Sequence, residues 1–168
     1  MNSWVTRAER GGDATVIREL LTAAFPTADE ARFVDDLRAD PNAWMDGLSI
    51  VTESDGQIVG YALSTRCHVD EEPALTLGPC AVWPSRQRTG VGSAAIRAGL
   101  EAARRLGENL VLVLGHAEYY PRFGFERASR FGIRAPFDVP DEAMMALALD
   151  DSRPVPSGTI VYPPAFGV

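Results

Sequence analysis

The sequence predicts an α/β fold with a mixed, mostly antiparallel central sheet and flanking helices. Segments typical of strands alternate along the chain with segments whose apolar residues recur at helical spacing. The continuous apolar run Leu110–Leu114 is typical of a strand that is covered on both faces. A further strand, Leu75–Trp83, is followed by a turn rich in glycine and arginine and then by the clearest helix in the sequence, Val91–Leu106. Together these patterns favour helices packed on both faces of one sheet.

The first half of the chain has clear starts, stops and turns. Asp13 is placed to cap the first helix, and Pro26 follows its end. Ser54-Asp55-Gly56 is a hairpin signal between two strands. Gly78-Pro79 interrupts the last of these strands and predicts a bulge or an opened pairing, because proline donates no hydrogen bond to a neighbouring strand. The elements expected here are a strand (3–8), two helices (14–25 and 29–38) and three strands (48–53, 57–65 and 75–83).

The second half continues the alternation. The helix over residues 91–106 has a buried stripe that includes Ile96 and Leu100, and Gly107 ends it. The further elements expected are strand 110–114, a short helix at 118–123, a strand starting at 125 and late strands at 144–149 and 159–162. The length favours one domain over residues 1–168, with its core at about 3–150 and a C-terminal strand and tail at 151–168.

Composition excludes several classes of protein. The net charge of −7 argues against nucleic-acid binding, and all sixteen basic residues are arginine. We expect no membrane partner, because no apolar run is long enough to cross a bilayer, and the N-terminus lacks the pattern of a signal peptide. Cys67 and Cys80 give no metal spacing and no disulfide framework. These features predict a reduced, cytoplasmic protein without a metal site.

The turn before residue 91 has the chemistry of a phosphate site. Gly90 and Gly92 let the backbone approach a ligand closely, and the following helix offers N–H groups that have no partner inside the helix. Arg86 and Arg88 add positive charge. A dinucleotide-binding loop is one alternative, since Gly90 to Ala95 fits G-x-G-x-x-A, but six residues separate the strand from the first glycine. A purely structural glycine-rich turn is the other.

At this point the chain resembles the GNAT superfamily of N-acetyltransferases. Val82-Trp83-Pro84 followed by Gln87-x-x-Gly90-x-Gly92 is similar to the family's acyl-coenzyme A signature. Tyr120-Pro-Arg-Phe-Gly124-Phe125 follows some thirty residues later, in the family's order. The resemblance covers about residues 4–149 and is strongest between Leu75 and Phe125.

The resemblance implies acetyl-CoA as cosubstrate and a sheet in which two neighbouring strands splay apart around its pantetheine arm. Backbone groups of Ala81 and Val82 would then hold pantetheine and the thioester carbonyl. N–H groups of the turn and the helix start would hold the pyrophosphate. The residues implied at this part of the site are Gln87, Arg88, Thr89, Gly90, Val91, Gly92 and Ser93.

Acetyl transfer to an amine needs a route for the amine's proton and a proton for the leaving thiolate. The resemblance places the general acid at Tyr120, with Tyr119 as its rival and simple packing of both rings as the alternative. His116, after the strand at 110–114, is a candidate base, and a structural histidine is the competing interpretation. His68, near the acidic run at 70–72, is expected in a solvated loop. Cys80 as the nucleophile of a ping-pong route is a further alternative.

The acceptor pocket is expected from segments 26–32, 42–45 and 131–141, which mix aromatic and acidic residues. Such a wall would suit a cationic amine, although a solvated acidic face is the simpler interpretation. The residues concerned are Trp44, Phe131 and Phe137, with Asp29, Glu30, Asp138 and Asp141. The tail from Pro154 is expected to cover a sheet edge, to line the pocket or to form the interface of a homodimer.

These observations predict an N-acetyltransferase that transfers an acetyl group from acetyl-CoA to a primary amine of a small molecule or a protein N-terminus. The amine would attack directly in a ternary complex. Two alternatives stay open at the level of sequence. One is a non-catalytic acyl-CoA-binding or regulatory module on the same fold, and the other is an enzyme that acylates a hydroxyl or uses a longer acyl chain.

Overall fold

The computed structural model describes residues 3–168; residues 1 and 2 of the predicted domain lie outside the described part. Its centre is a nine-stranded sheet in the order β1-β2-β3-β4-β5-β8-β6, with β9 paired to both β3 and β7. The strands are β1 (Trp4–Ala8), β2 (Ser49–Ser54), β3 (Gln57–Val69), β4 (Glu72–Val82), β5 (Leu110–Leu114), β6 (Glu126–Arg127), β7 (Ile133–Arg134), β8 (Met144–Ala148) and β9 (Gly158–Val161). Only the pairs β4–β5 and β7–β9 are parallel among these strands, which confirms the predicted mixed, mostly antiparallel sheet.

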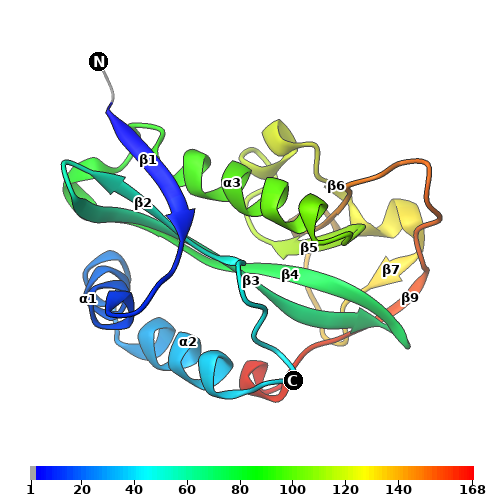
Figure 1. Ribbon diagram of the computed structural model, residues 1–168. Coiled ribbons are helices and arrows are strands. Elements are labelled where there is room, and N and C mark those ends of the chain that lie inside the picture. The colour runs from blue at the N-terminus through cyan, green and yellow to red at the C-terminus, as the bar shows by residue number, and fades with distance from the viewer. Residues whose placement is uncertain (1–2) are drawn as a thin grey trace.

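Three helices cover the two faces of the sheet, as Figure 1 shows. Helices α1 (Asp13–Ala24) and α2 (Asp29–Ala39) lie on one face, and α3 (Val91–Arg105) lies on the other. One buried cluster, around Leu75 and Ile96, packs beneath α3, and a second, around Leu20 and Tyr61, packs beneath α1 and α2. Within residues 3–168 no helix has the length and apolar character to cross a membrane.

The predicted hairpin between β2 and β3 is confirmed. Ser54 pairs with Gln57, and Asp55 and Gly56 take φ values of 53° and 77°, the left-handed conformations that such a two-residue turn requires. The next hairpin is longer than predicted, because β3 continues to Val69 and β4 already begins at Glu72.

The acidic run at 70–72 is exposed to solvent, as predicted, but it forms a tight turn and the start of a strand rather than a longer loop. Asp70 accepts a hydrogen bond from the backbone N–H of Thr159 at 3.0 Å, which ties the turn to β9. His68 lies in β3 opposite Val161, so it belongs to this end of the sheet. The predicted tail does cover a sheet edge through β9.

Several boundaries differ from the prediction. Asp13 is the first residue of α1 and not its cap; Gly12 holds the cap position at a φ of 92°. The Asp13 carboxylate instead accepts a hydrogen bond from the Arg10 N–H at 2.8 Å and pairs with Arg7. The predicted short helix at 118–123 is a single 3-10 turn, η2 (Tyr120–Phe123), and the strand expected from Phe125 is only the two-residue β6.

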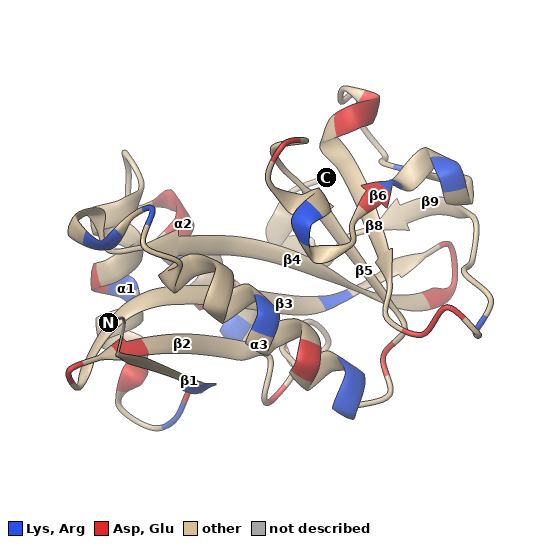
Figure 2. Ribbon diagram, turned by 90° about the horizontal axis from the view of Figure 1, so that it is seen from above, with Lys and Arg blue, Asp and Glu red and all other residues tan. Residues whose placement is uncertain are grey.

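Further 3-10 turns join the elements. They are η1 (Pro84–Arg86), η3 (Ala128–Phe131), η4 (Asp141–Ala143) and η5 (Pro164–Phe166). The C-terminal turn η5 packs beside α2, so the C-terminus lies on the face of the sheet that α1 and α2 cover (Figure 1). In Figure 2 the charged residues lie mainly on helices, turns and loops, while the central strands carry few of them.

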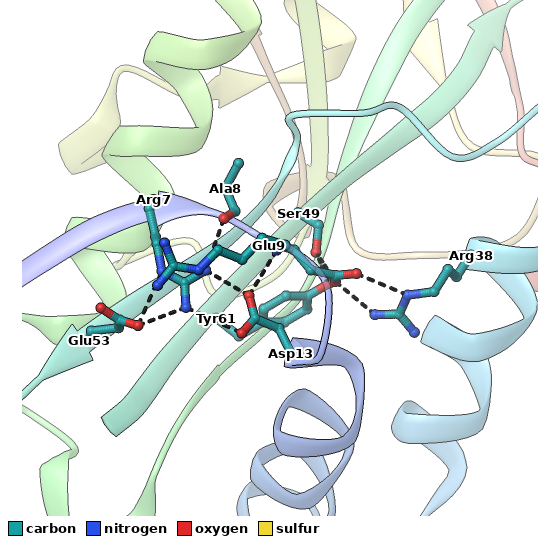
Figure 3. A network of polar contacts seen from close by, with 9 residues as sticks. Arg7, Ala8, Glu9, Asp13, Arg38, Ser49, Glu53 and Tyr61 are labelled. Carbon is teal, nitrogen blue, oxygen red and sulfur yellow. Dashed lines mark hydrogen bonds and ion pairs between the residues drawn. The ribbon is translucent and has the colours of Figure 1, made fainter. Parts of the chain in front are cut away.

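A buried polar network joins the first strand to the helices α1 and α2 (Figure 3). The Glu9 carboxylate accepts hydrogen bonds from Arg38 and from the Ser49 hydroxyl, both at 2.8 Å. The fully buried Tyr61 hydroxyl lies 2.7 Å from Ser49 Oγ, and burial raises the pKa of this phenol. These bonds give the Glu9 carboxylate and the Tyr61 hydroxyl polar partners where α2 covers the sheet.

Candidate active site at the parting of β4 and β5

The site begins at a bulge in β4. Leu77 pairs with Ser64 and Cys80 with Ala62, so Gly78 and Pro79 together lie opposite a single residue of β3. The Gly78-Pro79 peptide bond is cis. This two-against-one arrangement confirms the bulge that the sequence predicted.

Strands β4 and β5 part at the same point. They run in parallel through the pairs Leu75–Val111, Thr76–Leu112 and Leu77–Val113, and the pairing ends there. Beyond the bulge, residues 80–82 of β4 pair with β3 alone. The splayed strand pair is therefore confirmed.

The turn after β4 presents free amide groups at the start of α3. Arg88 and Gly90 take φ values of 64° and 95°, and Gly90 caps the helix without any side-chain hydrogen bond. In the described chain the amide groups from Arg88 to Ser93 donate no hydrogen bond to another protein group. These donors and the helix dipole make the turn suited to an anionic phosphate.

The start of α3 packs unusually close to the strands below it. A Cβ atom on Gly92 would lie 2.8 Å from Cγ2 of Val82, and one on Gly60 would lie 2.5 Å from Cγ1 of Val91. The Thr52 hydroxyl donates a hydrogen bond to the Val91 carbonyl at 3.1 Å. The glycines thus hold the helix start directly against the ends of β4 and β3.

The remaining polar side chains of the turn have local partners or face solvent. Arg86 donates a hydrogen bond to Ser54 Oγ at 3.2 Å, and the Thr89 hydroxyl donates to the Arg86 carbonyl at 2.5 Å. Arg88 is exposed. Ser93 Oγ lies 2.9 Å from the Tyr119 hydroxyl, which fixes the Tyr119 side chain at the start of α3.

A cavity of about 590 Å³ opens where the two strands part. Its floor is formed by β4 and by the residues after β5, and its walls come from α2, η2 and the C-terminal segment. The lining residues are Phe25, Glu30, Phe33, Thr76, Leu77, Gly78, Pro79, Cys80, Leu114, Gly115, His116, Tyr120, Phe137, Tyr162 and Phe166.

Tyr120 lines this cavity together with Cys80. Burial raises the pKa of Tyr120 above its ordinary value, so the phenol is protonated at neutral pH. The ring lies against Gly115, where an added Cβ would overlap its Cε2 atom. Tyr119 does not line the cavity.

Cys80 also lines the cavity, but its chemistry does not favour a nucleophile. Burial raises the pKa of the Cys80 thiol to about 12. With this pKa, almost every molecule carries Cys80 as the thiol at neutral pH. The thiol is unreactive, since the thiolate is the nucleophile. This argues against the ping-pong alternative.

His116 lies at the exposed rim of the same cavity. Its position after β5 places it in the same lining as Tyr120, as its place in the sequence suggested. His68 is remote, because it lies at the end of β3 beside β9.

The expected acceptor wall is present only in part. Glu30 and Phe137 line the cavity, but Trp44 does not: its ring lies beneath the Arg38 guanidinium, 4.9 Å from it, beside α2. The other predicted wall residues do not line the cavity either. Asp29 pairs with Arg32, Asp141 pairs with Arg127 at 3.1 Å, Asp138 is exposed, and Phe131 packs in the cluster around Ile133.

Sequence analysis named the tail as one possible wall of the pocket but not the individual residues that enter the cavity. Tyr162 and Phe166 enter from the C-terminal tail, so the tail lines the cavity as well as covering an edge. Phe33 follows Glu30 by one helical turn, a spacing that could have linked the two. Gly115 carries no sequence signal beyond its place after a strand.

A sequence model described as the acetyltransferase (GNAT) family matches residues 14–125. The chain is 42% identical over 135 residues to the protein named "Uncharacterized N-acetyltransferase YjhQ" of Escherichia coli K12, a match that covers 77% of this chain and 74% of that relative.

Two solved structures share the fold over nearly the whole chain. The GNAT family N-acetyltransferase YhbS from Escherichia coli, in complex with CoA, has a TM-score of 0.91 at 28% identity and covers 100% of this chain and 94% of its own. A GNAT family acetyltransferase from Brucella melitensis, in complex with acetyl-CoA, has a TM-score of 0.80 at 31% identity, with 99% of each chain covered.

Proposed function

The chain belongs to the acetyltransferase (GNAT) family, and on this premise we propose that it transfers an acetyl group from acetyl-CoA to a primary amine of a small molecule or a protein N-terminus. One observation carries the proposal: β4 and β5 part beside a cavity that Tyr120 lines and next to the free amide groups of α3. The proposed unit is a single domain over residues 1–168.

Acetyl-CoA is the cosubstrate, and the residues present fit it. The two similar structures are complexes with CoA and with acetyl-CoA. In this chain the free amides from Arg88 to Ser93 suit the pyrophosphate, and the backbone of Ala81 and Val82 beyond the bulge suits the pantetheine and the thioester carbonyl. Gln87 begins this turn and Arg88 adds charge at its surface.

The cavity residues can then serve direct transfer in a ternary complex. An alkyl amine of pKa ~10.4 must lose a proton at neutral pH, at a cost of roughly 4–5 kcal/mol. We assign acceptance of that proton to His116 at the cavity rim, either directly or through water. Tyr120 donates its proton to the departing thiolate, since its phenol is held in the protonated form.

The proposal includes a cytoplasmic location and assembly as a homodimer. Both cysteines, Cys67 and Cys80, are free thiols, which suits a reducing cytoplasm. A homodimer stays a prediction, and light scattering of the purified protein in solution tests it.

The proposal is tested by thermal shift with acetyl-CoA, CoA, dephospho-CoA and NAD at equal concentrations, followed by thiol release with a panel of amines. A ligand at a hundred times its Kd stabilises the fold by about 2.7 kcal/mol, which raises Tm by about 5–11 °C. We expect a shift with acetyl-CoA and CoA and none with NAD. No shift with either CoA form would overturn the proposal, and binding without any thiol release would favour the non-catalytic alternative.

A further inference from the structure

Among residues 3–168, Glu30 contributes the one carboxylate that lines the cavity beside Tyr120. We propose that Glu30 binds the ammonium group of the acceptor, and that the site selects primary amines with an apolar or aromatic body and no carboxylate. This inference rests on the proposed acetyltransferase function and adds the class of acceptor to it.

The first support is the state of the Glu30 side chain. Its Oε2 atom is buried and, within residues 3–168, has no hydrogen-bond partner. The neighbouring Asp29 is exposed and already paired with Arg32. A buried carboxylate oxygen without a partner is costly, and a ligand N–H group would satisfy it with a charge-assisted hydrogen bond.

The second support is a row of aromatic rings along the cavity. Phe33 meets Phe166 edge to face at 4.7 Å between ring centroids, and Phe166 stacks on Tyr162 at 4.7 Å. Tyr162 in turn stacks on Phe137 at 5.9 Å. All four rings line the cavity that holds Glu30. Ring faces attract a cation and also bury an apolar body, so the row suits an arylalkyl ammonium ion.

The third support is the shortage of positive charge. No arginine lines the cavity among the described residues, and the chain contains no lysine. His116 at the exposed rim is the one lining side chain that can carry a positive charge. The carboxylate of an amino-acid acceptor would therefore be buried beside Glu30 without a strong partner, which is unfavourable for two like charges.

The test compares two matched acceptors in two variants. Phenethylamine and phenylalanine share a ring and an amine and differ by one carboxylate. Glu30→Gln removes the charge at constant shape, and Asp29→Asn does the same at the adjacent exposed acid. Steady-state acetylation with acetyl-CoA gives kcat and KM, and calorimetric titration of each amine into the CoA-loaded protein gives Kd.

We expect phenethylamine to be the better acceptor by at least about 100-fold in kcat/KM. Glu30→Gln should raise its KM and its Kd by about 10- to 100-fold, the usual range for a hydrogen bond to a charged group, and change kcat little. Asp29→Asn should leave the KM and the Kd for phenethylamine within about twofold of the values for the unsubstituted protein. The CoA-induced thermal shift should be equal in all three proteins, which separates loss of acceptor binding from misfolding.

Three results would overturn the inference and leave the acetyltransferase function standing: phenylalanine equal to phenethylamine, equal effects of Glu30→Gln and Asp29→Asn, or no binding of phenethylamine to the CoA-loaded protein while another class of amine is acetylated. Failure of CoA itself to bind would instead overturn the proposed function, and the inference with it.

Discussion

At the scale of single residues, the site depends on how one ring is held. Tyr120 packs against Gly115, and a T-shaped contact with Phe125 at 5.9 Å supports the ring from another side. Its side chain lines the same cavity as Cys80, the residue that follows the bulge of β4. A ring confined in this way points its hydroxyl at the place where β4 and β5 separate, which is the geometry that a proton donor to a leaving group needs.

Removal of the Tyr120 hydroxyl tests that role. We expect Tyr120→Phe to lower kcat by about 10- to 10³-fold with little change in the Kd for CoA, because the proton donor is lost and the ring contacts remain. The control is Tyr119→Phe, which removes a hydroxyl bonded to Ser93 outside the cavity and should lower kcat far less. Equal effects of the two variants would remove Tyr120 from the mechanism.

Gly115 offers a second residue-scale prediction. Gly115→Ala places a methyl group inside the Tyr120 ring, so the ring must move; we expect at least a tenfold loss in kcat and about 1–3 kcal/mol of destabilisation. Gly99→Ala, within α3, places its methyl group 3.6 Å from Ile50 and should keep activity and stability, since alanine favours a helix. Steady-state kinetics and urea unfolding of both variants check this, and a fully active Gly115→Ala would contradict the assigned packing.

At the scale of elements, the junction between β4 and α3 positions the coenzyme turn. The helix start lies so close to the strand end that a Cβ atom at residue 92 would lie 2.8 Å from Cγ2 of Val82, so either the helix or the valine would have to shift. Movement of the helix by a fraction of an ångström would shift every free amide of the turn at once.

This coupling predicts rescue by a second substitution. Gly92→Ala should weaken CoA binding by about tenfold, or about 1.4 kcal/mol, because the new methyl group meets Val82 Cγ2 at 2.8 Å. Val82→Ala removes that atom, so the double variant should recover most of the lost affinity. Calorimetry on the four proteins gives the coupling energy. Additive losses would show that the contact does not set the position of the helix.

The elements that sequence reasoning predicted well carry local signals. The hairpin at Asp55-Gly56, the bulge at Gly78-Pro79 and the helix ending before Gly107 each follow from residue types at fixed positions. Strand β7 was missed because it has two residues and exists only through its pairing with β9. Asp13 was misplaced because its partner, Arg7, lies in β1 and not in the helix that it was expected to cap.

At the scale of the whole molecule, ion pairs join segments that are distant in sequence. Arg7 bonds both Asp13 at 2.6 Å and Glu53 at 2.7 Å, so one side chain links β1, α1 and β2 (Figure 3). Hydrogen bonding from Arg7, with a further contribution from the Arg10 N–H, holds the pKa of Asp13 below its ordinary value of 3.8.

The sign of this shift predicts how stability depends on pH. Because the folded-state pKa lies below 3.8, the contribution of Asp13 is present above pH 3.8 and is lost as the pH falls through the folded value. We expect Asp13→Asn to be less stable than the natural protein at pH 7, with the difference shrinking below pH 3.8. Urea unfolding across this range measures it, and a difference independent of pH would contradict it.

The control for this series is Asp36→Asn. Asp36 is exposed and makes no ion pair in the part of the chain that the structure describes, so its replacement should change the free energy of unfolding by less than about 0.5 kcal/mol at every pH.

The candidate site, like the ion pairs, depends in part on contacts between segments that are distant in sequence. Sequence reasoning cannot predict such contacts. The turn from Gln87 to Ser93 could be predicted because one continuous segment carries it. The acceptor cavity could be predicted only in part, since Phe33 and Phe166 meet through tertiary packing of residues more than a hundred positions apart. Burial of the Glu30 oxygen likewise exists only after the chain has folded.

The gap between β4 and β5 also bears on how the protein could be inhibited. The coenzyme turn belongs to α3 on one face of the sheet, and three rings of the aromatic row belong to α2 and the C-terminal segment on the opposite face. A single compound that joins the sulfur of CoA to an arylalkyl amine through a short inert bridge would lie between β4 and β5. It would occupy the coenzyme turn and the aromatic row at once. Such a tethered ligand would gain from the high effective concentration of each half near its own subsite.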